Sequence, residues 1–147
     1  MEPEETVVPE VEEEAAQSLK EILTGHDEKP GQEQIDAWKV QYGSAFVSGF
    51  DEEELYIWRP MNRREYKTLQ ARRDELMVLA QQGQGNPLGE AEWEEMICHT
   101  CVLWPQVEES YWSEKAKAGA PSTLAGQIMT QSAFLNPQAA SYLVEKL

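Results

Sequence analysis

The sequence predicts an α+β fold that is predominantly α-helical: one small domain with a short β-hairpin and an acidic N-terminal arm. Three observations support this fold class. The chain has 147 residues, the length of one domain with a tail. Apolar residues recur at helical spacing through most of it, whereas only two short runs are β-rich. Hydrophobic residues make up 41% and include five tryptophans, enough to build a core.

The first part of the chain is strongly acidic. Residues 1–14 contain seven glutamates and no basic residue, so self-repulsion favours an extended arm that either stays solvated or orders on a basic partner. A short helix is expected over 12–24, where apolar residues recur at helical spacing before Gly25. We therefore assign 1–31 to the arm and a linker, and 32–147 to the helical α+β domain.

The first half of the domain combines a helix with the hairpin. The helix is expected over Gln32–Tyr42, because Ile35, Trp38 and Tyr42 form one stripe and Gly43 follows. Two β-rich runs, 44–50 and 55–59, flank a short acidic turn and predict antiparallel strands. Pro60 ends the second strand, since proline lacks the N–H that a strand ladder needs.

The rest of the domain is expected to be helical. A helix is predicted over 63–82, with Asn62 as its cap and Glu65 in the position of a capping box. A second is predicted over 90–102, closed by residues 103–105, after a loop at 83–89. Further helices are expected from Pro121, with Leu124, Ile128, Gln131 and Leu135 on one face, and from Asn136 to near Leu147.

One cluster has a spacing seen in metal and redox sites. Cys98 and Cys101 form a CxxC motif with His99 between them, and two thiolates at this spacing can bind one zinc ion. A tetrahedral site needs four ligands, and the chain offers only His26 in addition. We therefore expect packed thiols and no cofactor, and keep a CxxC metal-binding or redox module as an alternative.

Half of the basic residues gather after the hairpin. They are Arg59, Arg63, Arg64, Lys67, Arg72 and Arg73. One interpretation is that they pair with the protein's own acids, such as Glu65, Asp74 and Glu75 or those of the N-terminal arm. The other is a protein-docking surface with aromatic anchors beside the bases. For that surface we predict the residues Trp58, Arg59, Arg63, Arg64, Tyr66 and Lys67.

Composition argues against several classes of function. The net charge of −15 disfavours free binding to nucleic acid, which requires clustered bases. No apolar run approaches the length of a membrane span, so no membrane partner is expected. Motifs such as GxSxG, Walker A and GxGxxG do not occur. The sequence therefore predicts a protein that is not an enzyme.

Four stretches together resemble a known group of proteins. They are IDAWKVQYGSAFVSGF, YIWRPMNRREYKTL, the acidic helix ending in CVLWP, and AGAPSTLAGQIMTQSAF. Over about residues 34–135 they resemble small proteins of tailed-bacteriophage tail assembly. Tail assembly chaperones of this kind are largely helical and keep the tape measure protein soluble while tube subunits polymerise around it.

This resemblance implies a function and a location. It implies a non-enzymatic tail assembly factor that binds tape measure, tail tube or baseplate proteins in the host cytoplasm during assembly, or stays in the virion. Adaptable apolar grooves would be supplied by methionines, namely Met61, Met77, Met96 and Met129. The alternative within the same class is a structural virion protein of the baseplate, neck or capsid.

Overall fold

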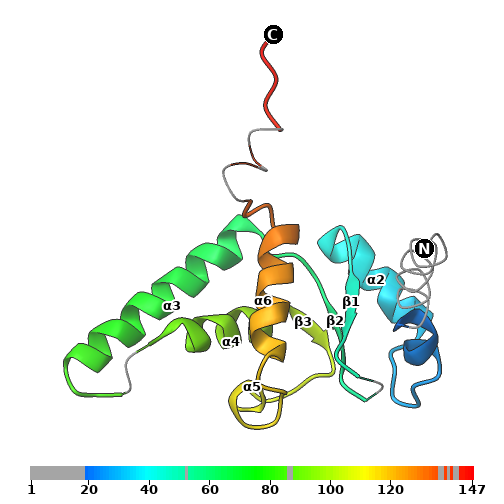
Figure 1. Cartoon of the computed structure of the whole chain (residues 1–147), viewed down its shortest axis with the longest axis horizontal. Helices are drawn as coiled ribbons and strands as arrows, with labels where there is room; N and C mark the ends of the chain where they lie inside the picture. Colours follow the sequence, from blue (N-terminus) through cyan, green and yellow to red (C-terminus); the bar gives the residue numbers. More distant parts are fainter. Residues whose placement is uncertain (1–18, 52, 86–87, 136–137, 139, 141–142) are drawn as a thin grey trace, which may run out of the picture.

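A three-stranded antiparallel sheet lies at the centre of the protein (Figure 1). The computed structural model describes residues 19–51, 53–85, 88–135, 138, 140 and 143–147. The strands are β1 (Phe46–Gly49), β2 (Leu55–Trp58) and β3 (Val102–Trp104), in the order β1-β2-β3. The first two form the predicted hairpin, so this part of the prediction is confirmed.

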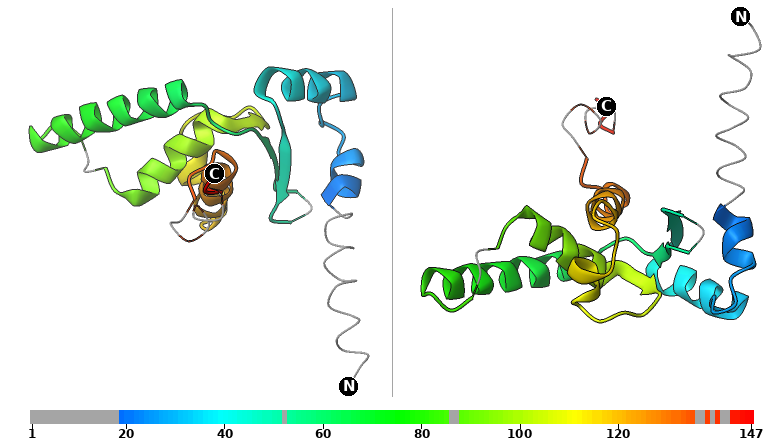
Figure 2. Two further views of the ribbon diagram at one scale, coloured as in Figure 1. Left: turned by 90° about the horizontal axis from the view of Figure 1, so that it is seen from above. Right: turned by 60° about the horizontal axis from the view of Figure 1, so that its bottom comes forward.

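The central strand β2 is buried along its whole length because both faces of the sheet are covered. Figure 2 shows helix α6 (Ala120–Gln131) on one side of the hairpin, and helix α2 (Gln32–Tyr42) with the helical residues 19–24 on the other. The second face is packed so closely at Gly49 that an added Cβ would lie 2.5 Å from a methyl group of Leu19. A side chain at position 49 would therefore force the side chains of Leu19 and Leu55 to shift.

Strand β3 corrects the sequence prediction. The sequence predicts a helix that runs to Val102 and is closed by residues 103–105, but helix α4 (Glu90–Cys101) stops at Cys101 and Val102 is already extended. The reason is tertiary: the N–H of Arg59, just after β2, donates to the carbonyl of Cys101 at 3.1 Å, and residues 102–104 continue as a strand beside β2. The helical spacing of apolar residues in α4 does not predict that the backbone after β2 lies beside residues 102–104.

Two predicted helices are confirmed at their ends. Helix α2 has the predicted bounds, and Gly43 follows it with φ of 85°. Helix α3 (Arg63–Gln81) begins at the predicted capping box, in which Asn62 Oδ1 accepts from the N–H of Glu65 and a Glu65 carboxylate oxygen accepts from the N–H of Asn62. The capping box thus satisfies two of the free N–H groups at the start of α3.

The hydrophobic core lies between the sheet and the later helices. Helix α6 packs against α4, and the single turn α5 (Tyr111–Glu114), which was not predicted, buries Trp112. The apolar face of α6 is confirmed for Leu124 and Ile128, whereas Gln131 is exposed. The core side chains are Tyr56, Trp58, Met61, Leu69, Ile97, Cys98, Cys101, Trp112, Ala120, Leu124, Ala125 and Ile128.

The ends of the chain are described only in part. Residues 19–28, assigned to the arm and linker, contact the sheet: the indole N–H of Trp104 donates to the carbonyl of Glu28 at 3.1 Å. The acidic residues 1–14, and much of the helices predicted over 12–24 and from Asn136, lie outside the described residues. Residues 144–147 are not helical. Among the described helices, none is both long enough and apolar enough to cross a membrane.

Candidate functional site

The predicted docking surface divides into a buried part and an exposed part. Trp58 and Arg59 are only 3% and 6% exposed, so the prediction that they belong to an accessible surface is wrong. Arg63, Arg64 and Lys67 are exposed on the first turns of α3, and Tyr66 is half-buried there. The six predicted residues therefore span the junction between the buried strand β2 and the surface helix α3.

Trp58 is buried because it faces α6 from the central strand. Its ring stacks on Phe46 with centroids 4.7 Å apart, and its indole N–H donates to Ser48 Oγ at 2.8 Å. The Ser48 hydroxyl in turn donates to Gln127 of α6 at 2.6 Å. The polar atom of Trp58 thus has its partner inside the protein, and the side chain ties the hairpin to α6.

Arg59 is buried because it links four segments. Its guanidinium makes two bonds to the Glu65 carboxylate, at 2.7 and 2.6 Å, and a third to the carbonyl of Thr100 at 3.1 Å. It also lies 4.4 Å from the ring centroid of Tyr42. Partial burial opposes ionisation of Glu65, but the bonds from Arg59 and from the N–H of Asn62 hold its pKa below the ordinary value. Arg59 is therefore a structural brace.

The exposed bases at the start of α3 do not pair with the protein's own acids in the part of the chain that is described. Arg63, Arg64 and Lys67 make no ion pair there, and the one pair formed farther along α3, Arg72 with Glu75, spans 3.9 Å between exposed side chains. An ion pair of this kind contributes little. Among the described residues, self-pairing thus holds for the buried Arg59 with Glu65 and only weakly for Arg72 with Glu75, while pairing with the acidic residues 1–14 lies outside the described residues.

Arg63 and Tyr66 border a shallow pocket of about 220 Å³ at the end of α6. The Tyr66 ring lies 4.7 Å from that of Phe134, centroid to centroid, and the Arg63 guanidinium lies 5.5 Å from the Tyr66 ring. Two of the six predicted residues are thus brought together with Phe134, which the sequence did not single out.

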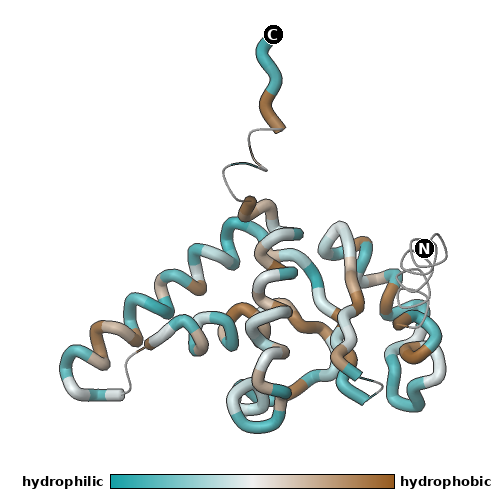
Figure 3. Tube along the Cα trace, in the orientation of Figure 1, coloured by the Kyte–Doolittle hydropathy of each residue, from teal (hydrophilic) through white to brown (hydrophobic). Residues whose placement is uncertain are grey.

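The far half of α3 presents apolar side chains to solvent. Over its 19 residues only Leu69 is buried, while Met77 and Val78 are 40% and 50% exposed. Figure 1 shows this half running away from the sheet, and Figure 3 shows apolar residues near its end. Of the four methionines predicted to line adaptable grooves, Met61 is buried and Met96 and Met129 pack on the core. Only Met77 fits that prediction.

The CxxC motif lies in the core. Cys98 and Cys101 are free and fully buried, and Cys98 Sγ donates to the carbonyl of Pro121 at 3.4 Å. Burial raises the pKa of each thiol to about 12, so both are protonated at neutral pH. His99 is exposed. No group of three potential metal ligands occurs among the described residues, and these positions do not favour a metal or redox site.

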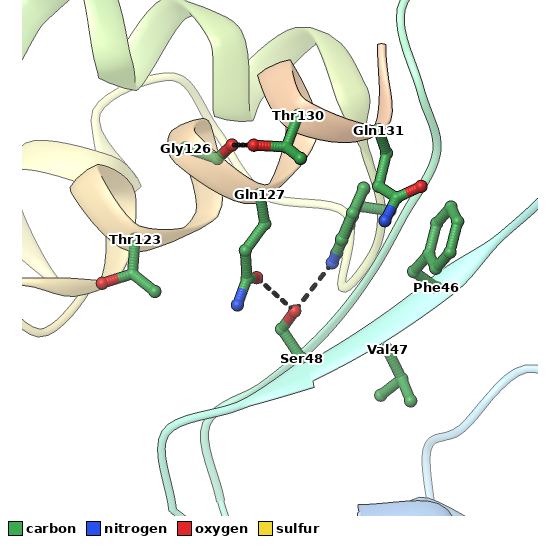
Figure 4. Close-up of a pocket in the computed structure, with 9 residues that line it drawn as sticks. Phe46, Val47, Ser48, Thr123, Gly126, Gln127, Thr130 and Gln131 are labelled. Carbon is green, nitrogen blue, oxygen red and sulfur yellow. Dashed lines mark hydrogen bonds between the residues drawn. The ribbon is translucent and has the colours of Figure 1, made fainter. Parts of the chain in front are cut away.

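A groove that the sequence analysis missed lies between the hairpin and α6. Its volume is about 580 Å³, and Figure 4 shows Ser48 pointing toward Gln127 while Val47 points away from α6. The lining residues are Phe46, Val47, Ser48, Trp58, Thr123, Gly126, Gln127, Thr130 and Gln131. One signal could have revealed it: no charged residue occurs between Lys39 and Asp51 or between Lys117 and Glu145, in a chain that is 27% charged.

Comparisons with protein-family models, with curated proteins and with solved structures found no match. The candidate surfaces therefore have to be interpreted from their own geometry and chemistry. The resemblance to phage tail proteins rests on the four sequence stretches alone and stays a prediction.

Proposed function

We propose that the protein is a non-enzymatic assembly factor of tailed-bacteriophage tails, which binds the tape measure protein or the tube proteins. The observation that carries the binding role is the free half of α3, where Met77 and Val78 are exposed and Met77 lies beside Ala80 and Leu88. An uncovered apolar helix face marks a site of protein interaction. The phage context comes from the sequence resemblance.

The chemistry of α3 favours a helical segment as the occupant. Met77, Ala80, Gln81 and Leu88 border a concavity of about 210 Å³, a shape that accepts side chains from a second helix. Methionine adapts to partners of different shape, which suits a protein that holds a client before assembly. The bases Arg63, Arg64 and Lys67 on the same helix would attract acidic residues of the client.

The test is co-expression with the tape measure protein and, separately, with the tube protein of the phage genome that encodes this chain. We expect a soluble complex with one of them on size exclusion. Met77→Asp combined with Val78→Asp should weaken it about tenfold or more, because burying each apolar side chain contributes roughly 1.5 to 3 kcal/mol. The matched control is Val40→Asp, since Val40 is 87% exposed on α2.

Three outcomes would contradict this proposal. The first is that the chain forms a complex with neither the tape measure protein nor the tube protein. The second is equal weakening by the Val40 control, which would indicate a general loss of solubility. The third is recovery of the chain in stoichiometric amount from purified mature particles, which would favour the structural virion protein of the baseplate, neck or capsid.

A further inference from the structure

The two edges of the sheet differ in whether another strand could pair with them. The β3 edge is only three residues long, has a register irregularity against β2, is followed by Pro105, and is contacted by residues 26–28 through Trp104. These features block the addition of another strand. The β1 edge lacks the irregularity and the proline, because Phe46–Gly49 pairs with β2 in unbroken register and contains no proline or charge. Leu19 contacts β1 at Gly49, on the face of the sheet opposite α6 (Figure 2).

Strand β1 presents backbone groups outward. The N–H of Phe50 bonds to the carbonyl of Glu54, and in an antiparallel pair the bonded positions alternate, so Ser48 and Phe46 also bond to β2. The N–H and C=O groups of Val47 and Gly49 therefore point away from the hairpin. No backbone bond to another segment engages them among the described residues.

The groove beside this edge has a lining without charge. The α6 residues that border it are exposed and are all small or polar: Thr123, Gly126, Gln127, Thr130 and Gln131. Because the side chain of Val47 points away from α6, Val47 borders the groove through its backbone (Figure 4). Depletion of charge is typical of the centre of a protein interface.

Gly126 has no structural role that explains it. Glycine is the weakest helix former after proline, yet Gly126 lies within α6, where an added Cβ would meet nothing within 4 Å. Its φ is not in the left-handed region. The absence of a side chain at this position keeps the groove open and lets another backbone approach α6 closely.

We propose that this groove binds an extended, uncharged segment of a partner protein, which joins the sheet as a fourth strand on β1. Val47 and Gly49 supply the main-chain hydrogen bonds. Alternate side chains of the added strand enter the groove between Phe46, Ser48 and Gly126. This site uses neither α3 nor the phage role, so it goes beyond the function proposed above.

The uncharged lining of the groove disfavours two other occupants, namely the chain's own acidic residues 1–14 and a second copy of the chain. The chain's own residues 1–14 carry seven glutamates, and a carboxylate in this groove would be desolvated without a basic partner. A second copy pairing through β1 would bring together two chains of net charge −15. An uncharged segment of another protein meets neither penalty.

The test selects a randomised library of short peptides against the full chain and labels the best binder for fluorescence anisotropy. We expect uncharged peptides, and slower amide hydrogen exchange at Val47 and Gly49 when the peptide binds. Gly126→Glu should weaken binding about tenfold or more, because it fills the groove and adds an unpaired charge. It should not lower the thermal midpoint, since the new side chain enters open space and favours helix.

The controls keep the result decisive. Ser122→Glu places the same charge on α6 outside the groove and should leave binding unchanged, whereas Thr130→Arg should weaken binding despite its opposite charge. The proposal is overturned if no peptide binds, if the binders are charged, or if both groove variants bind as the parent does. It is also overturned if the chain sediments as a dimer that Gly126→Glu dissociates, because a second copy would then occupy the edge.

Discussion

Replacing Arg59 with methionine tests whether this residue braces the core, as the structure indicates. Arg59→Met keeps most of the side-chain length but removes both bonds to Glu65 and the bond to the carbonyl of Thr100. Breaking a buried ion pair costs roughly 3 to 5 kcal/mol. The Glu65 side chain is 25% exposed and can regain some water, so we expect a loss of about 3 kcal/mol at neutral pH.

The assay is urea unfolding of the full chain, followed by tryptophan fluorescence. With a slope of about 2 kcal/mol per molar urea, the expected loss moves the midpoint by about 1.5 M. Glu65→Gln and the double variant complete a thermodynamic cycle, in which the two single losses should exceed that of the double variant by about 1 to 2 kcal/mol. A loss below about 1 kcal/mol for Arg59→Met would refute the brace and return Arg59 to the set of docking candidates.

The pH dependence gives a second check on the same pair. Because the folded-state pKa of Glu65 is lowered, its stabilising contribution is fully present above the pKa of an unfolded glutamate and is lost as pH falls to the folded value. Arg59→Met removes the main partner of Glu65. The parent should therefore lose more stability than this variant between neutral pH and the acidic range, and parallel pH profiles would contradict the assignment.

Two further predictions concern the thiols and the hairpin turn. Cys98 and Cys101 are fully buried and their thiols have pKa values of about 12, so we expect them to react with iodoacetamide at pH 8 only after unfolding. A chelator should leave the thermal midpoint of unfolding unchanged. Fast labelling of the native chain would instead support a redox site. Asp51 accepts from Lys117 and from the N–H groups of Glu54 and Glu53, which lowers its pKa to about 2. Its contribution to stability is present above the ordinary aspartate pKa and disappears as pH falls toward 2, so Asp51→Asn should flatten the acid limb of the stability profile. An unchanged acid limb would mean that Asp51 is equally ionised in the unfolded chain.

The local elements were predictable because their signals lie within a few residues. The capping box of Asn62 with Glu65, the stop at Gly43 and the hairpin before Pro60 each depend on backbone groups that neighbouring residues satisfy. The third strand was not predictable in this way. Val102 and its neighbours become a strand only because the backbone after β2, at Arg59, lies beside them.

The sequence by itself determined the fold class, the beginnings of α2, α3 and α4, and the absence of charge along β1 and α6. Only the tertiary structure decided which residues of the stretch YIWRPMNRREYKTL (56–69) are buried and which are exposed. Trp58 and Arg59 look like surface anchors in the sequence, since tryptophan and arginine favour interfaces. In the structure β2 is covered on both faces, and the indole N–H of Trp58 and the two terminal nitrogens of Arg59 find partners inside. Four residues later Arg63 is exposed, because α3 turns away from the sheet. Burial depends on which elements pack together, and that information is spread over the whole chain.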